Sequence, residues 1–175
     1  SLNRLAGMRG LSMEVVAQAD ALCREVVRYF GATGAADQIS AELDEAVLGA
    51  ANSTIQKFPA LDGLENRLAS RSVDSSKLFR VFRARLTEAL KAAPAGPAKD
   101  ELRALSAATR RYNDDVLTVR NVLGHALEAR GDDGWQILDE GGDVYMTVAD
   151  FPTHRANFLG NLRAIREIHR LLIVQ

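Results

Sequence analysis

A heptad pattern of apolar residues between positions 102 and 126 constrains the fold of this chain more than any other feature. Counted in sevens from Leu102, the a and d positions are Leu102, Leu105, Thr109, Tyr112, Val116, Val119, Leu123 and Ala126. Apolar side chains at this spacing line one side of an α-helix. We therefore predict a long helix over residues 98–130 that buries this seam in its own domain.

The other side of this predicted helix carries three polar residues of interest. Asn121 and His125 take heptad positions f and c, so they lie four residues apart on one helical face, turned away from the seam. Arg120 takes position e, on the flank. Taken alone, this pattern is most simply an exposed polar helix face.

The rest of the chain predicts an all-α fold with a small β-element. Helical periodicity covers residues 11–30, 37–58, 62–70 and 76–92, and a final helix, capped by residues 150–153, ends near residue 174. Glycine ends the first helix at positions 31–34, Asp74 or Ser75 caps the helix over 76–92, and Pro97 opens the long helix.

Before the last helix, the segments 135–138 and 144–148 flank a glycine turn and predict a β-hairpin, with Trp135 as the residue that anchors it on the helices. The predicted fold is one domain over residues 1–175, a bundle of about five or six helices with this hairpin inserted before the last.

Charge excludes a generally basic nucleic-acid binder. Lys and Arg number 22 against 23 Asp and Glu, so an RNA ligand would have to meet a local patch. The polar side of the helix over 76–92 is basic, with Arg80, Arg83, Arg85 and Lys91. A solvated face is the simpler interpretation, and the alternative is a strip that contacts phosphates, in which Arg80 and Arg83 bind RNA.

Composition favours a cytoplasmic protein without a membrane span. No apolar run approaches the roughly 20 residues that cross a bilayer, and residues 1–10 lack the apolar core of a signal peptide. Cys23 is the only cysteine, which excludes a disulfide within the chain and fits a reducing compartment. Ser1 in place of a methionine is compatible with a piece of a larger protein.

Several classes of site have no motif here. His125, His154 and His169 are not in an HxxxH or HExxH pattern, and there is no CxxC, so we expect no metal and no cofactor. Phosphate-binding glycine loops and the GxSxG serine motif are also absent. His169 is more simply a packed or capping residue of the last helix, and His154 lies in the first turn of that helix.

The residue types in the run 120–125 suit cleavage of RNA by its own 2′-hydroxyl. That reaction needs a base, an acid and a cation that stabilises charge on the phosphate. Histidine titrates near neutrality and serves as base or acid, and the forked, permanently charged side chain of arginine suits a phosphate oxyanion. No metal is required.

The run Arg-Asn-Val-Leu-Gly-His at 120–125 resembles the signature of the HEPN superfamily (higher eukaryotes and prokaryotes nucleotide-binding). Members carry an arginine, usually followed by Asn, Asp or His, and a histidine shortly after. Arg120, Asn121 and His125 match these positions; the resemblance covers about residues 37–174, and only the motif is specific. It implies a helical bundle, a dimer with two motifs across a two-fold axis, and metal-independent RNase activity, often in toxin–antitoxin, antiphage or stress-response systems.

Three hypotheses follow. The first is a homodimeric HEPN-type endoribonuclease in which His125 is the general base or acid, Arg120 clamps the phosphate and Asn121 orients the phosphate or the histidine. The second is a non-catalytic helical module that pairs with itself or with an antitoxin-like or regulatory protein partner. A nucleotide-binding or nucleotidyl-accepting role is a third.

Overall fold

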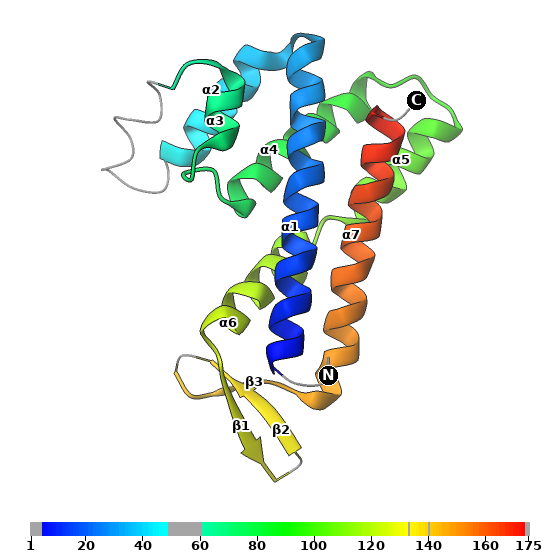
Figure 1. Cartoon of the computed structure of the whole chain (residues 1–175). Coiled ribbons are helices and arrows are strands. Elements are labelled where there is room, and N and C mark those ends of the chain that lie inside the picture. The colour runs from blue at the N-terminus through cyan, green and yellow to red at the C-terminus, as the bar shows by residue number, and fades with distance from the viewer. Residues whose placement is uncertain (1–4, 49–60, 133, 140, 174–175) are drawn as a thin grey trace. The chain divides into compact units, whose positions relative to one another are not determined.

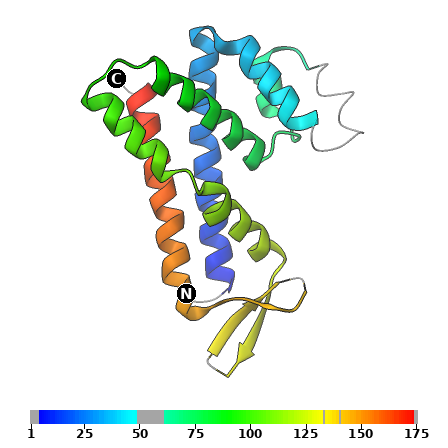
Figure 2. The same ribbon diagram turned by 180° about the vertical axis from the view of Figure 1, so that it is seen from behind.

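A computed structural model describes residues 5–48, 61–132, 134–139 and 141–173, and Figures 1 and 2 show the trace from opposite sides. The chain divides into two compact units. The first comprises Ser1–Gln18 and Ala108–Ala164, and the second comprises Ala19–Ala107 and Ile165–Gln175. The predicted fold class is confirmed: the protein is a helical bundle with one small antiparallel sheet before its last helix.

The regular elements in the described part of the second unit are all helices. Its elements, besides parts of the two long helices α1 (Leu5–Phe30) and α7 (Phe151–Ile173), are η1 (Gly31–Ala35), α2 (Ala36–Leu48), α3 (Gly63–Ala69), α4 (Ser75–Ala92) and α5 (Pro97–Ala108). The core between them is apolar, with Leu43 of α2 and Phe82 of α4 fully buried. Cys23 of α1 is buried there too, and burial raises the pKa of its thiol.

Local sequence explains where these helices begin and end. Gly34, with a φ of 107°, adopts the left-handed conformation that favours glycine and separates α1 from α2. The carboxylate of Asp74 caps α4 by accepting a hydrogen bond from the backbone N–H of Lys77 at 2.9 Å. Partial burial acts to raise the pKa of Asp74, but the hydrogen bonds and the charge of Lys77 hold it below its ordinary value.

The helix boundaries predicted from sequence are therefore confirmed at Gly34, at Asp74 and at Pro97, the first residue of α5. The helix predicted over 37–58 is confirmed as far as Leu48, and its remainder lies outside the described residues. The first helix was predicted to begin at residue 11, but α1 begins at Leu5.

The first unit combines the start of α1 and the start of α7 with the segment that carries the polar run. Its other elements are η2 (Asn113–Thr118), α6 (Val119–His125), β1 (Leu127–Gly131), β2 (Gly134–Leu138), β3 (Val144–Thr147) and η3 (Val148–Asp150). The residues of η2 are wound in wider π-type turns, and this helical segment continues directly into α6.

The prediction of one helix over residues 98–130 is wrong in two places. α5 ends at Ala108, and after a turn in which the N–H of Tyr112 donates to the carbonyl of Thr109 at 3.1 Å, helical structure resumes. No glycine or proline marks this break, which coincides with the boundary between the two units. The buried seam is nevertheless confirmed, because every a and d position except the half-buried Leu105 is buried.

The second error is at the end of the predicted helix, where residues 127–131 form a strand. The sheet therefore has three antiparallel strands in the order β1-β2-β3, rather than the two of the predicted hairpin. Leu127 pairs with Leu138, and Gly131 pairs with Gly134 across a connection whose Asp133 lies outside the described residues. The glycines expected to end a helix thus frame a strand turn, with Gly134 at a φ of 116°.

The sheet packs through Ile137 and Met146, which pair across β2 and β3 and are both buried. Trp135, which shares a face of the sheet with Ile137, is 36% exposed, and its role as the anchor stays a prediction. After β3, Asp150 closes a capping box with Thr147, whose backbone N–H and hydroxyl donate at 2.8 and 2.9 Å. These hydrogen bonds hold the pKa of Asp150 below its ordinary value.

Candidate functional site

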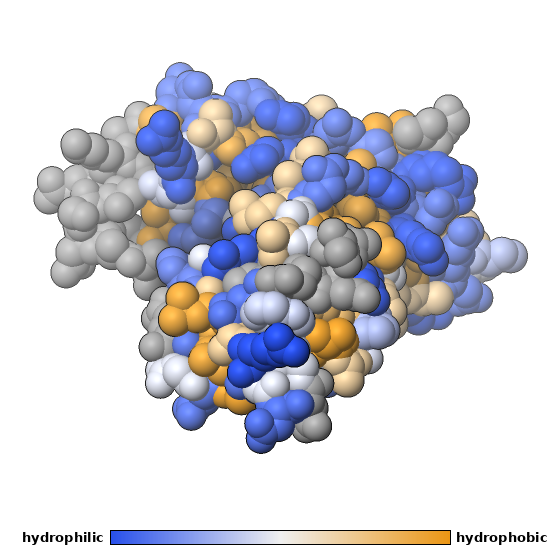
Figure 3. All heavy atoms as spheres, turned by 60° about the horizontal axis from the view of Figure 1, so that its bottom comes forward, coloured by the Kyte–Doolittle hydropathy of each residue, from blue (hydrophilic) through white to orange (hydrophobic). Residues whose placement is uncertain are grey.

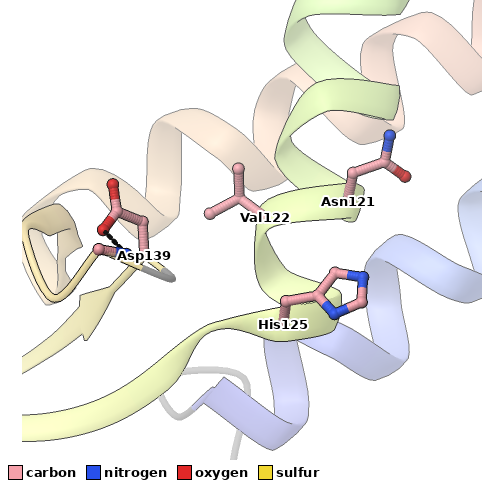
Figure 4. Close-up of a pocket in the computed structure, with 5 residues that line it drawn as sticks. Asn121, Val122, His125 and Asp139 are labelled. Carbon is pink, nitrogen blue, oxygen red and sulfur yellow. Dashed lines mark hydrogen bonds between the residues drawn. The ribbon is translucent and has the colours of Figure 1, made fainter.

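The polar run lies on α6, the last helical segment before the sheet. Val119 and Leu123 point into the core of the first unit and are buried, whereas Asn121 and His125 are exposed. Figure 4 shows the side chains of Asn121 and His125 pointing the same way from one side of α6, with Val122 directed toward the connection that contains Asp139. The predicted division between a seam and a polar face is confirmed by this burial.

A recess of about 370 Å³ opens beside this helix. It is lined by Asn121, Val122, His125, Asp139 and Gly141. The volume is within the range of sites for small organic ligands. The recess lies between α6 and the β2–β3 connection. Antiparallel pairing forms it, because Leu138 at the end of β2 pairs with Leu127, which begins β1 just after α6.

Asp139 and Gly141 were not among the site residues predicted from sequence. The carboxylate of Asp139 accepts hydrogen bonds from the backbone N–H groups of Gly141 at 2.9 Å and of Asp143 at 3.0 Å. This is how an aspartate at the start of a glycine-rich turn fixes its own connection. The turn itself was visible in the sequence, but its position against α6 was not.

Arg120 differs from its neighbours in burial. It is half-buried, and its Nε is fully buried without a hydrogen-bond partner among the residues that the structure describes. Within those residues no acidic side chain forms an ion pair with it either. A partly desolvated guanidinium without a counter-charge is stabilised by a bound anion.

The end of α6 is held by Arg9 of α1. The Nε of Arg9 donates to the carbonyl of Leu123, and Nη2 donates to the carbonyl of Ala126 at 2.5 Å. These two carbonyls bracket His125 in the chain. Arg9 was not singled out from the sequence, where a lone arginine near position 10 gives no signal of a contact more than a hundred residues away.

Arg80 and Arg83, the predicted RNA contacts, belong to the second unit and have partners there. Arg80 pairs with Glu45 at 2.8 Å, and Arg83 donates to the backbone carbonyl of Ser106 at 2.6 Å and to its hydroxyl at 2.9 Å. The contact with Ser106 links α4 to α5. A role of these arginines in binding RNA stays a prediction.

The other two histidines, His154 and His169, are not among the residues that line the recess. His169 contacts the carboxylate of Glu25 on α1, within the second unit. His154 is in the first turn of α7, and its Nδ1 is buried without a hydrogen-bond partner in the described ranges.

The described residues have neither a metal-binding cluster nor a membrane-spanning helix. They contain no group of three or more His, Cys, Asp or Glu side chains arranged to hold a metal ion. None of the helices in these residues is both long and apolar enough to cross a membrane.

The recess therefore presents an imidazole, an amide and a carboxylate. Arg120, which precedes Asn121 in the chain, has no acidic partner among the described residues. This set can transfer protons, donate hydrogen bonds and bind an anion. Compared with known proteins, the chain matches no family model, no curated protein and no solved structure.

Proposed function

We propose that the chain is a metal-independent endoribonuclease of the HEPN type that acts as a homodimer, with Arg120, Asn121 and His125 in its active site. The observation that carries the proposal is Arg120, a half-buried cation for which the described residues provide no acidic partner. A phosphate of RNA would supply that charge. Asn121, the residue after Arg120, and His125 line the recess, so an amide and an imidazole are carried by the same short helix as the anion site.

The proposed reaction uses the ribose 2′-hydroxyl as its nucleophile. This oxygen forms a bond to phosphorus while its proton passes to a neutral imidazole, and the bond from phosphorus to the 5′-oxygen breaks as that oxygen receives a proton from an imidazolium. The products are a 2′,3′-cyclic phosphate and a 5′-hydroxyl end. Arg120 would stabilise the charge on the non-bridging oxygens, and Asn121 would orient the phosphate or the histidine.

A homodimer is part of the proposal because the two proton transfers are best served by two imidazoles. Among its described lining residues, the recess has one histidine, His125. A second copy related by a two-fold axis would bring a second His125 and a second Arg120 to one cleft. Gly124 is exposed, and a Cβ built on it would meet no atom within 4 Å, which favours close approach of another backbone there.

The test is cleavage of single-stranded RNA by the purified protein in the presence of EDTA. Wild type is compared with Arg120→Ala and His125→Ala, and the matched control is Arg163→Ala, which removes an exposed arginine from α7 in the same unit. We expect cyclic-phosphate products from wild type and control. Each site variant should lose about a hundredfold or more, as for removal of a general acid or base at His125 and of a charge-stabilising group at Arg120. Cleavage that survives both site substitutions excludes the assignment.

One observation favours the alternative, a non-catalytic dimerisation or regulatory module. Leu127 and Val144 both pair with Leu138 across the sheet, and they are 66% and 54% exposed. Figure 3, which brings the sheet forward, shows hydrophobic atoms at the surface among hydrophilic ones. Such side chains fit a protein partner. A wild-type protein that cleaves no RNA, together with a dimer that Leu127→Ser dissociates, would favour this module.

As a ribonuclease, the protein would act in a toxin–antitoxin, antiphage or stress-response system, in which an antitoxin-like or regulatory partner restrains it. Such a partner would need to cover the recess or prevent the pairing of two copies. Inhibition of RNA cleavage by the partner, with no effect on the folding of the chain, is the corresponding measurement.

A further inference from the structure

The helix that carries His125 has a weak end. α6 is seven residues long and stops at His125, and the next residue, Ala126, is extended, with φ −65° and ψ 153°. The position before His125 is Gly124, which is one of the least favourable residues in a helix. The last carbonyls of any helix also lack partners within the helix. The direction of the His125 side chain therefore depends on what holds this turn in place.

Arg9 holds it from another part of the chain. Its guanidinium donates to the carbonyl of Leu123 and to that of Ala126, the latter at 2.5 Å, and both hydrogen bonds are partly buried. A cation at the C-terminal end of a helix also interacts favourably with the partial negative charge there.

The turn of α1 that presents Arg9 is itself fixed. Met8 and Ser12 on either side of it are buried, and the hydroxyl of Ser12 donates to the backbone carbonyl of Arg9 at 2.9 Å. Arg9 thus transmits the position of a buried turn to the end of α6.

We infer that Arg9 is a positioning residue, which fixes the last turn of α6 and thereby the imidazole of His125. What His125 does once positioned rests on the proposed function, whereas the hold on α6 does not. Arg9 acts through backbone carbonyls, and its role is therefore separable from that of Arg120, which would contact the substrate.

Hydrogen exchange of backbone amides tests, without RNA, whether Arg9 fixes the last turn of α6. The reporter is the amide of Ala126, which donates to the carbonyl of Val122 at 2.8 Å and closes the end of α6. In Arg9→Met, exchange at this amide should rise by about tenfold or more, because two hydrogen bonds from a charged donor are lost. Amides in the middle of α7, around Phe158, should not change. Arg9→Lys, which keeps the charge but has its N–H donors on a single nitrogen in place of the guanidinium fork, should give an intermediate value.

A second substitution separates fixation of the helix end from a general effect of charge. Gly124→Ala adds a methyl group into open space, and alanine favours the helix by about fivefold over glycine. In the Arg9→Met background it should recover about that factor in Ala126 exchange. The control Arg163→Met removes an exposed arginine of the same unit and should leave the exchange unchanged.

RNA cleavage gives the second readout. Arg9→Met should lower kcat with little change in KM, because a misdirected imidazole slows the reaction step while Arg120 still binds phosphate. Unchanged Ala126 exchange in Arg9→Met, or no recovery with Gly124→Ala, would overturn the inference. A wild-type protein that cleaves no RNA would refute the proposed function but leave the exchange result to decide the role of Arg9.

Discussion

Glu42 of α2 and Arg85 of α4 form an ion pair in the second unit that makes a sharp prediction about stability. The Nη2 of Arg85 donates to Oε1 of Glu42, and the two side chains are 6% and 23% exposed. Arg85 Nε and Glu42 Oε2 are buried without hydrogen-bond partners in the described part of the chain. The pair is therefore desolvated, and its members depend on each other.

Removal of one member of the pair should lower the free energy of unfolding more when the member that remains is deeply buried. Glu42→Ala leaves the guanidinium of Arg85 without its counter-charge, and loss of one partner of a buried pair costs roughly 3–5 kcal/mol. Because Glu42 is partly exposed, water can reach the vacated site, and we expect about 3 kcal/mol. Arg85→Met leaves the more exposed Glu42 and should cost about 2 kcal/mol, whereas replacing both by Leu and Met should be close to neutral.

The same two helices provide the control. Arg80 of α4 and Glu45 of α2 also form an ion pair, at 2.8 Å, but both side chains are exposed. Glu45→Ala should therefore cost less than about 1 kcal/mol. Thermal unfolding followed by circular dichroism measures both, since about 3 kcal/mol lowers Tm by roughly 6–12 °C in a chain of this size. Equal decreases in Tm for Glu42→Ala and Glu45→Ala would refute the reasoning.

Three further predictions concern single residues. Because the pKa of Asp74 is lowered in the folded state, its carboxylate stabilises the fold at pH values above its ordinary pKa, and this stability is lost as the pH falls through the folded-state pKa. The stability of Asp74→Asn, measured by acid unfolding, should therefore depend less on pH below about pH 4 than that of the wild type. Burial raises the pKa of Cys23, so its thiol should resist alkylation at pH 8 in the native protein and react fully in denaturant. Mass spectrometry measures the alkylated fraction, and rapid alkylation of the native protein would contradict the prediction. Ile137→Ala should lose about 2–4 kcal/mol of unfolding free energy in urea, whereas Trp135→Ala should lose less because Trp135 is 36% exposed and Ile137 is buried. The reverse order would support Trp135 as the anchor of the sheet.

Sequence alone was sufficient for the features that depend on neighbouring residues. Apart from the half-buried Leu105, the a and d positions that the heptad spacing predicted to be buried from Leu102 to Leu123 are buried, including the fully buried Thr109 in the middle of the seam. Turn and cap chemistry located the glycine after α1, the aspartate before α4 and the proline at the start of α5. The exposed face with Asn121 and His125 follows from the same spacing, because burial on one side of a helix requires exposure on the other.

The structure of residues 127–131 could not be predicted in this way. Leu-Glu-Ala-Arg is a run of good helix formers, and a following glycine is as compatible with the end of a helix as with a turn between strands. The segment is a strand because its backbone groups pair with β2, and β2 pairs with β3. A strand is stabilised by its neighbours and has little local signal of its own.

The candidate site shows the same division. The sequence determined that Arg120, Asn121 and His125 share a helix, and that Asn121 and His125 face away from its buried seam. Only the tertiary structure decided that Asp139 and Gly141 complete a recess beside them, that Arg120 is half-buried without an acidic partner in the described residues, and that Arg9 holds the end of α6. The physical reason is distance along the chain: periodicity and capping act over a few residues, whereas these contacts join segments that are brought together by the pairing of strands and the packing of α1 against α6.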